Sequence, residues 1–362
     1  MKASLLIFES EIADLQHYIQ ELELESKLLL SYINETAPMI HELLLLQLQD
    51  HMSSTIIKRR VFNYNCIIVT LYGYFEQFIE SMLKAYVSNL NKIVPKYMEL
   101  PSRITKHQIE LSFRLLSRIE QTRYKSSITP ELLISNLYSC VMDSDKYQVN
   151  AEAFTHHRAN FRIDTIQESF SLVGISNISE KIKMNAQFSK YLSDQFPGRK
   201  TANIRSKEIF FYLNDLAERR NDVAHGTPTE DILNNKYLSE YINFFISFGF
   251  ALHDIVRNES LQFELKYQGV ELGSPICVLN KGYVVCIASK KSKLKIGDLI
   301  VAKTNDKNNP YLMGEIQELQ IENSKVLEVG PECDVGIRVP FKAKMTHSFF
   351  VIPEHIADET QI

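Results

Sequence analysis

The stretch Asp215-Leu-Ala-Glu-Arg-Arg-Asn-Asp-Val-Ala-His-Gly226 combines reactive side chains with a definite spacing. It places Arg220, Asn221 and His225 near the end of a predicted helix whose N-cap is Ser206. Asn221 and His225 are four residues apart and therefore share one face of that helix. Arg220 lies about 140° around the helix from His225, so a single helix separates these two side chains.

Glycine usage predicts two regions of different structure. Five of the twelve glycines precede residue 261 and seven follow it, and valine shifts in the same direction. Few glycines favour long helices, whereas valine and glycine together favour short strands joined by turns. We therefore expect an all-α helical bundle over residues 1–260, followed over residues 261–362 by a small β-barrel or sandwich. Its predicted strands are 284–287, 299–301, 314–316 and 335–339.

Composition excludes several classes of function. The formal net charge of -4 argues against nucleic-acid binding over the whole surface and requires a local patch instead. The five cysteines form no C-x-x-C pair, which favours reduced thiols in the cytoplasm. No apolar run approaches the roughly 18 residues that span a bilayer, so no membrane association is expected. Phosphate-cradling and dinucleotide motifs are missing, and no Asp, Glu and His cluster has metal-ligand spacing, so neither a cofactor nor a metal is expected.

The basic patch is predicted in the segment from His156 to Lys207. This segment holds nine Lys and Arg against four acidic residues. A local basic excess near the predicted reactive helix suits a phosphate backbone, although a solvated loop explains the same charges. The predicted substrate contacts are His157, Arg158, Arg199, Lys200 and Arg219.

A further candidate residue, Glu76, lies in the strongest helical pattern of the chain, residues 58–90. Its neighbours Tyr72, Phe75 and Ile79 belong to a wide apolar stripe, as expected of a helix inside a bundle. A carboxylate inside such a stripe is costly to bury without a cation or a hydrogen-bond donor. Either Glu76 has a partner, or it lies at a partly exposed edge of the stripe.

These residue types suit RNA cleavage without a metal ion. The reaction needs a base that takes the proton from a 2′-hydroxyl and a cation that stabilises the charge developing on the phosphate. His225 suits the role of base or acid, and the Arg220 guanidinium is a fixed fork of donors matched to phosphate oxygens. Asn221 suits the orientation of either partner.

The stretch 216–226 resembles the R-x(4–6)-H motif of HEPN domains, including the polar residue after the arginine. Leu71-Tyr-Gly-Tyr-Phe-Glu-Gln-Phe-Ile79 looks like the first core helix of the RiboL-PSP type of HEPN domain, and residues 159–175 are similar to the segment before the motif helix. The resemblance covers residues 10–257 in patches. It implies a helical domain that dimerises so that two Arg/His pairs line one cleft, with Glu76 as a supporting acid.

The carboxy-terminal region shows a separate resemblance. Leu294-Lys-Ile-Gly-Asp-Leu-Ile-Val301 and Val329-Gly-Pro-Glu-Cys-Asp-Val-Gly-Ile337 look like strands of the second-domain barrel of translation elongation factors. In the leading interpretation given below, this region recognises the target or restrains the enzyme.

Three interpretations stay open. The leading one is a HEPN endoribonuclease that cleaves tRNA or mRNA, with Arg220, Asn221, His225 and Glu76 as catalytic residues. The family resemblance implies a homodimer that acts as a prokaryotic toxin or anti-phage effector, with an antitoxin or the translation machinery as partner. The second interpretation is a non-catalytic scaffold that binds RNA or protein, and the third is a purely structural helical dimer.

Overall fold

The computed structural model describes residues 1–32, 39–120, 128–157, 159–227, 231–289, 293–306, 309–322 and 324–353. The chain divides into two compact units. Unit 1 comprises Met1–Met82, Thr155–Phe170 and Asn177–His253, and unit 2 comprises Leu83–Phe154, Ser171–Ser176 and Asp254–Ile362. No helix among the described residues has the length and apolar character that a membrane crossing requires.

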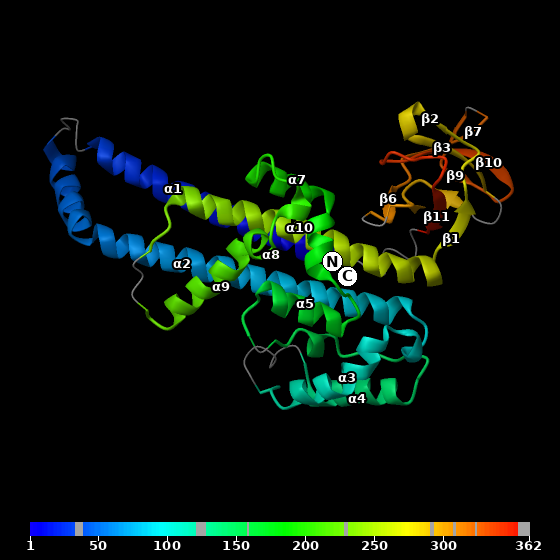
Figure 1. Ribbon diagram of the computed structural model, residues 1–362, viewed down its shortest axis with the longest axis horizontal. Coiled ribbons are helices and arrows are strands. Elements are labelled where there is room, and N and C mark those ends of the chain that lie inside the picture. The colour runs from blue at the N-terminus through cyan, green and yellow to red at the C-terminus, as the bar shows by residue number, and fades with distance from the viewer. Residues whose placement is uncertain are drawn as a thin grey trace. The chain divides into compact units, whose positions relative to one another are not determined.

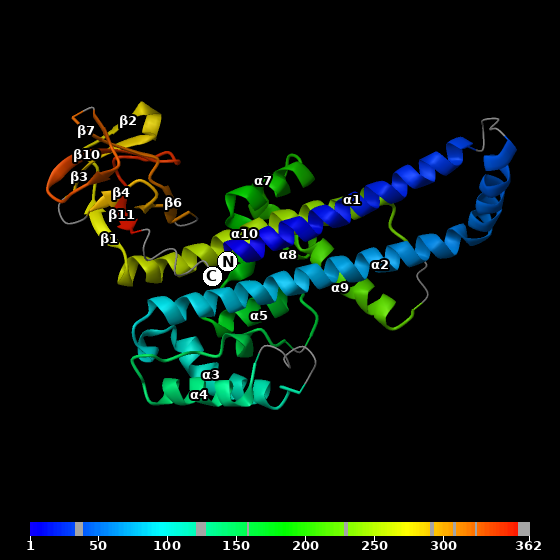
Figure 2. The same cartoon turned by 180° about the vertical axis from the view of Figure 1, so that it is seen from behind.

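Unit 1 is helical, and its long helices lie alongside one another (Figure 1; Figure 2 gives the view from behind). Its elements are α1 (Lys2–Tyr32), the first part of α2 (Met39–Ile93), most of α5 (Ile163–Leu172), α6 (Ile178–Met184), α7 (Ala186–Gln195), η3 (Thr201–Asn203), α8 (Ser206–Ile209), α9 (Phe211–Ala224) and the first part of α10 (Asn235–Tyr267).

Aromatic side chains hold α1, α2 and α10 together within unit 1. Phe75 of α2 packs edge-on against Phe245 of α10 at 4.8 Å between ring centroids, and Phe8 of α1 stacks on Phe78 at 4.4 Å. Gly249 permits this close approach, because a Cβ atom there would lie 2.8 Å from the Phe8 ring. The predicted apolar stripe is confirmed, since Phe75 is fully buried and Phe78 nearly so.

The predicted helix from Ser206 is interrupted. It consists of α8 and α9, with Phe210 between them in a non-helical conformation (φ -100°, ψ 22°). The Phe210 ring is fully buried and lies 6.4 Å from the rings of Phe188 and Phe248. The break between α8 and α9 therefore coincides with full burial of the Phe210 ring.

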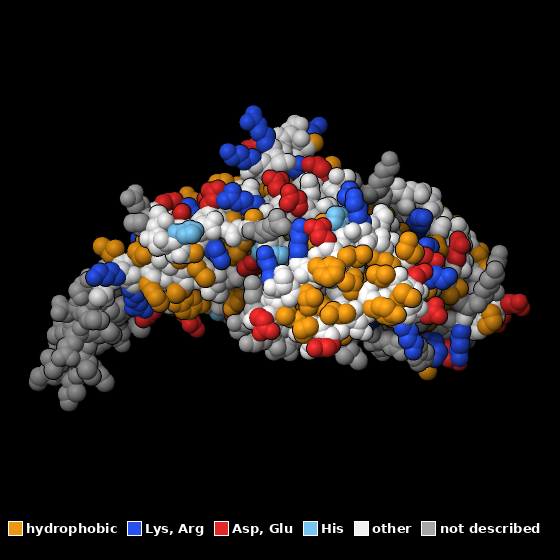
Figure 3. All heavy atoms as spheres, turned by 90° about the horizontal axis from the view of Figure 1, so that it is seen from below, with side chains coloured by type: hydrophobic (Ala, Val, Ile, Leu, Met, Phe, Trp, Pro, Cys, Tyr) orange, Lys and Arg blue, Asp and Glu red, His pale blue; other side chains and the backbone are white. Residues whose placement is uncertain are grey.

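Unit 2 begins with the end of α2 and a pair of short helices. It contains η1 (Tyr97–Glu99), α3 (Ser102–Leu116), α4 (Pro130–Val141) and η2 (Ala151–Phe154). One side of α3 and α4 is buried, but large apolar side chains are exposed on the other, where Figure 3 shows them gathered. They include Ile109, Phe113, Leu132, Ile134 and Tyr138.

Unit 2 ends with a β region, so the expected order of α followed by β is confirmed. Its elements are β1 (Val270–Gly273), β2 (Cys277–Leu279), η4 (Asn280–Gly282), β3 (Val284–Ser289), β4 (Leu294–Lys295), β5 (Leu299–Lys303), β6 (Tyr311–Glu315), β7 (Glu318–Ile321), β8 (Ser324–Val326), β9 (Glu328–Val329), β10 (Cys333–Arg338) and β11 (Ser348–Ile352).

The strands form three sheets rather than one closed barrel. Among the described residues, their orders are β1-β11-β5-β6, β2-β3-β10-β7-β8 and β4-β9. The two larger sheets share one core, to which β3 contributes Val285 and Ile287 and β5 contributes Ile300. The β region is therefore not a closed barrel, because its two larger sheets are open and pack on shared apolar side chains.

Helix α10 continues to Tyr267, about ten residues beyond its predicted end. Leu261 from this extension is buried with Val301 of β5 and Ile352 of β11. The four-stranded sheet is thus covered on both faces, which accounts for the uninterrupted apolar run at residues 299–302.

Candidate functional site

The end of α9 is a left-handed cap that leaves His225 on the surface. Gly226 has φ +66°, the conformation that glycine adopts without strain. The Thr227 N–H donates to the Asp222 carbonyl at 2.9 Å, and the Gly226 N–H donates to the Val223 carbonyl at 3.1 Å, which together form a Schellman motif. His225 is exposed, and its ring makes no hydrogen bond within the described part of the chain. The ring is therefore accessible to a ligand.

Arg220 is held against α2 by an aromatic ring. Its guanidinium carbon lies 5.3 Å from the centroid of Tyr72, a cation–π contact. Within the described residues, Arg220 has neither a hydrogen bond nor an ion pair, so its five N–H donors stay available. Burial raises the pKa of Tyr72 to about 12, while its hydroxyl accepts a hydrogen bond from the Phe161 N–H at 2.9 Å.

Asn221 is held from a different side. Its side-chain oxygen accepts a hydrogen bond from the Asn160 amide at 2.5 Å. Asn160 belongs to what we call the connecting segment, residues 155–157 and 159–162, which precedes α5. The same segment supplies the Phe161 N–H to Tyr72, so it is hydrogen-bonded to both α2 and α9.

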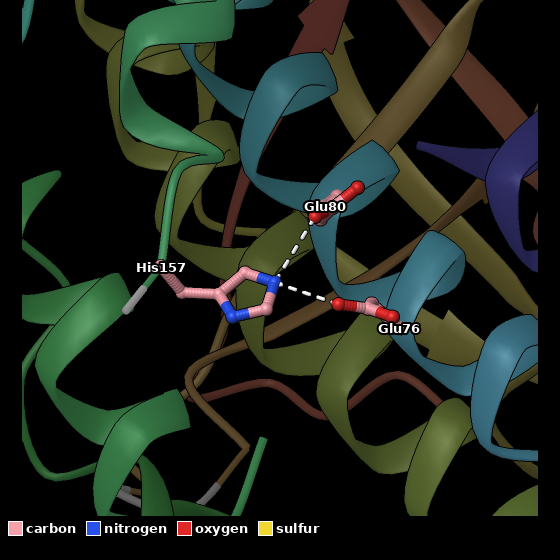
Figure 4. Close-up of side chains that lie close together, drawn as sticks. All are labelled: Glu76, Glu80 and His157. Carbon is pink, nitrogen blue, oxygen red and sulfur yellow. Dashed lines mark hydrogen bonds and ion pairs between the residues drawn. The ribbon is translucent and has the colours of Figure 1, made fainter. Parts of the chain in front are cut away.

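The carboxylate of Glu76 is partly exposed and also has a partner, so both alternatives drawn from the sequence apply. His157 Nε2 lies 2.9 Å from Glu76 Oε1 and 3.2 Å from Glu80 Oε1 (Figure 4). On the other side of the ring, His157 Nδ1 lies 2.7 Å from the Ala159 carbonyl. Burial alone would lower the pKa of His157, but the hydrogen bonds to Glu76 and Glu80 outweigh it and raise that pKa to about 9. Without a bound cation, His157 is therefore an imidazolium at neutral pH, with both ring nitrogens donating.

Arg219 occupies a network of its own. Its Nε donates to Asp215 at 2.5 Å, and its terminal nitrogens donate to Tyr64 at 2.8 Å and Asp231 at 2.9 Å. Asp215 also accepts a hydrogen bond from the Tyr241 hydroxyl. Burial acts to lower the pKa of Arg219, but its hydrogen bonds to Asp231, Asp215 and Tyr64 raise it above the usual range. Because these contacts occupy the guanidinium, the structure favours Arg220 over Arg219 for contact with a phosphate.

Within the described residues, no hydrogen bond or ion pair joins Arg199 or Lys200 to the end of α9. Arg199 is exposed and pairs with Glu208 at 2.8 Å, and Lys200 is exposed immediately before η3. Arg158 lies outside the described residues. Their contact with RNA, like that of His157, stays a prediction.

The sequence did not predict three residues that contact the candidate site residues. Tyr72 contacts Arg220, Glu80 contacts His157, and Asn160 contacts Asn221. Only Glu80 carried a usable signal, because it follows Glu76 by four residues and shares its helix face. The donor atoms of Glu76, Glu80 and His157 all lie within 4.8 Å of one another, a grouping that could hold a metal ion. The sequence shows no metal-ligand spacing, but the fold brings these three residues together in space.

Comparison with known proteins is consistent with this geometry. The family model described as RiboL-PSP-HEPN matches residues 40–258, which is 219 of the 362 residues. The matched region includes α2, the connecting segment and α9, and it ends before the first strand at Val270. A search of curated proteins found no match to the chain. The likeness of the β region to an elongation-factor barrel stays a prediction.

Proposed function

Because this chain belongs to the RiboL-PSP-HEPN family, we propose that it is an endoribonuclease whose chemistry needs no metal ion. Family membership supports an RNase or an RNA-binding role. The observation that carries the finer proposal is the contrast on α9: Arg220 has no polar partner among the described residues, whereas the adjacent Arg219 is occupied by Asp215, Tyr64 and Asp231. An unoccupied guanidinium and an exposed imidazole near one helix end suit a phosphate and a 2′-hydroxyl.

In the proposed reaction, His225 takes the proton of a ribose 2′-hydroxyl. The 2′-oxygen then forms a bond to the adjacent phosphorus while the bond from phosphorus to the 5′-oxygen breaks. Arg220 hydrogen-bonds the phosphate oxygens, on which negative charge increases in the transition state. The 5′-oxygen leaves with a proton from a second acid, and His225 of a second copy suits that role. The products are a 2′,3′-cyclic phosphate and a 5′-hydroxyl.

Two α2 residues support this arrangement. The Tyr72 ring positions Arg220 without occupying its N–H donors. Glu76 acts on the connecting segment through its ion pair with His157, and it places a carboxylate one helical turn after Tyr72. We assign Glu76 the role of a supporting acid. Its negative charge positions the cationic side chains around it and favours their charged forms.

A cleavage assay in EDTA tests the proposal. Purified protein is incubated with end-labelled tRNA and mRNA fragments, beside the Arg220→Ala and His225→Ala variants. The matched controls are Arg103→Ala and His17→Ala, which remove exposed side chains on α3 and α1. We expect cleavage by the wild type and both controls, with cyclic phosphate ends, and a loss in the two site variants. Equal cleavage by His225→Ala and wild type would contradict the assignment.

The proposed biological role is that of a prokaryotic toxin or anti-phage effector. The family resemblance supports this role, together with homodimerisation and an antitoxin or translation-machinery partner. Expression of the wild-type chain should arrest growth, and His225→Ala should relieve the arrest. Light scattering of the purified protein should give twice the chain mass of 41.9 kDa. A monomer would remove the second His225 from the mechanism.

A scaffold that binds RNA without cleaving it is the second candidate. It is favoured by the hydrogen bond from Asn160, which already occupies the Asn221 side-chain oxygen. For a scaffold, the wild type should bind labelled RNA without cutting it, and Arg220→Ala should weaken binding while His225→Ala has little effect.

A further inference from the structure

Three side chains from distant parts of the sequence converge beside α2. Glu76 and Glu80 lie one turn apart on α2, and His157 reaches them from the connecting segment (Figure 4). Their side chains are 28%, 13% and 13% exposed, respectively. The group is therefore mostly enclosed yet open enough to admit water.

The separations within the group match those of ligands around one metal ion. Ligand atoms at about 2.1 Å from an ion and about 90–100° apart are separated by roughly 3.0–3.2 Å. The His157 Nε2 atom lies 2.9 Å from Glu76 Oε1 and 3.2 Å from Glu80 Oε1. These two separations therefore suit an ion of that size, and the ligand atoms of Glu76 and Glu80 lie within 4.8 Å of each other.

The far side of the His157 ring also fits a metal ligand. Metal-binding histidines commonly donate their other ring N–H to a carbonyl or carboxylate, which fixes the tautomer. His157 Nδ1 lies 2.7 Å from the Ala159 carbonyl. Donation at Nδ1 permits a neutral tautomer whose Nε2 lone pair faces Glu76 and Glu80. The ring also packs on Phe161, with centroids 4.1 Å apart, which limits its rotation.

His157 approaches both carboxylates through one ring nitrogen, Nε2. The single Nε2–H is shared between Glu76 and Glu80, and like charges four residues apart on a helix repel each other. A divalent cation coordinates both carboxylates and takes the place of the shared proton. One imidazole nitrogen with two carboxylates is a ligand set for first-row transition ions such as Mn²⁺ and Zn²⁺.

We infer that Glu76, Glu80 and His157 form a binding site for a divalent transition-metal cation. Waters complete its coordination. The ion ties the connecting segment to α2, and through Asn160 and Phe161 it braces α9 and Tyr72. Metal binding at this site is independent of the proposed function. The bracing of an RNA-cleaving site by the ion rests on the proposed function. The ion takes no part in the proposed phosphate chemistry.

Direct binding of Mn²⁺ tests the site without reference to RNA cleavage. Mn²⁺ is chosen because its weak affinity for thiolates keeps it from cysteine sites. The full chain, freed of any affinity tag and stripped with chelator, is titrated and free Mn²⁺ is counted by electron paramagnetic resonance. We expect one Mn²⁺ per chain, displaced by Zn²⁺, and a rise in melting temperature on binding.

Two variants localise the ion. Glu80→Gln and His157→Gln should each weaken Mn²⁺ binding at least about tenfold and abolish the melting shift. The matched controls Glu131→Gln and His17→Gln change exposed residues on α4 and α1 and should leave binding unchanged. No binding by the wild type, or equal binding by His157→Gln, would overturn the inference.

A crystal of the wild-type chain grown with Mn²⁺ keeps the inference testable if a variant fails to fold. An anomalous peak bounded by Glu76, Glu80 and His157 is the expected result. A peak elsewhere, or none, rejects the site.

Discussion

Arg219 and Arg220 are neighbours in the sequence, yet they lie in two different environments. Arg219 forms hydrogen bonds with Asp215, Tyr64 and Asp231. Arg220 rests on the Tyr72 ring without a polar partner in the described parts of the chain. Adjacent residues on a helix point about 100° apart, so Arg219 contacts two carboxylates and a hydroxyl whereas Arg220 contacts an aromatic face.

We propose that this difference separates a stabilising role for Arg219 from a functional role for Arg220. A guanidinium whose donors are paired contributes to stability, because removal of one partner leaves a charge without compensation. A guanidinium over an aromatic ring is positioned while its donors stay available. The contrast therefore predicts that substitutions on the Arg219 side change stability and that those on the Arg220 side change activity.

The largest expected effect is on RNA cleavage. Arg220→Ala and His225→Ala should each lower the single-turnover rate by about a thousandfold, roughly 4 kcal/mol of barrier. Their free energies of unfolding should stay within about 1 kcal/mol of wild type, because neither side chain has a polar partner among the described residues. Cleavage rates and urea unfolding of the same preparations measure both quantities.

The second effect is on stability. Arg219→Ala should lower the free energy of unfolding by about 2–3 kcal/mol, because Asp215 loses its cation and Tyr64 loses a charged donor. Urea denaturation measures this loss. RNA cleavage at a temperature where the variant is folded should stay within a few fold of wild type. A variant as stable as wild type but inactive would reverse the roles of the two arginines.

Tyr72→Phe should have a smaller effect. The substitution keeps the ring under Arg220 but leaves the buried Phe161 N–H without its acceptor. We expect a loss of about 1–2 kcal/mol in unfolding free energy. Cleavage should fall only slightly, since the cation–π contact is retained. Hydrogen exchange of the Phe161 amide provides a local check, and slow exchange equal to wild type would contradict this account.

The smallest effect is expected from Asp231→Asn. The Asp231 side chain is 82% exposed, and exposed ion pairs contribute little because water screens them. The change in unfolding free energy should stay below about 0.5 kcal/mol, in contrast to that of Arg219→Ala. A loss as large as that of Arg219→Ala would place the stabilising contact at Asp231 rather than at Asp215.

Local patterns in the sequence were sufficient for the helical core and for the end of the motif helix. The apolar spacing around Phe75 predicted a buried helix, because a period of 3.6 residues brings such side chains to one face. Gly226 predicted the stop after His225, because the left-handed cap favours glycine. The order of helices followed by strands came from glycine and valine usage. The first two inferences depend on neighbours within a few turns, and the third depends on the composition of the two regions.

The tertiary structure alone decided the partners of the site residues. His157 and Glu80 are 77 positions apart, and no local pattern joins them. The choice between Arg219 and Arg220 depends on Tyr64 and Tyr72, which come from another helix. The extension of α10 depends on the sheet that covers Leu261. Sequence periodicity determines which face of a helix is apolar. The residues that contact each polar side chain are decided only when distant segments pack together.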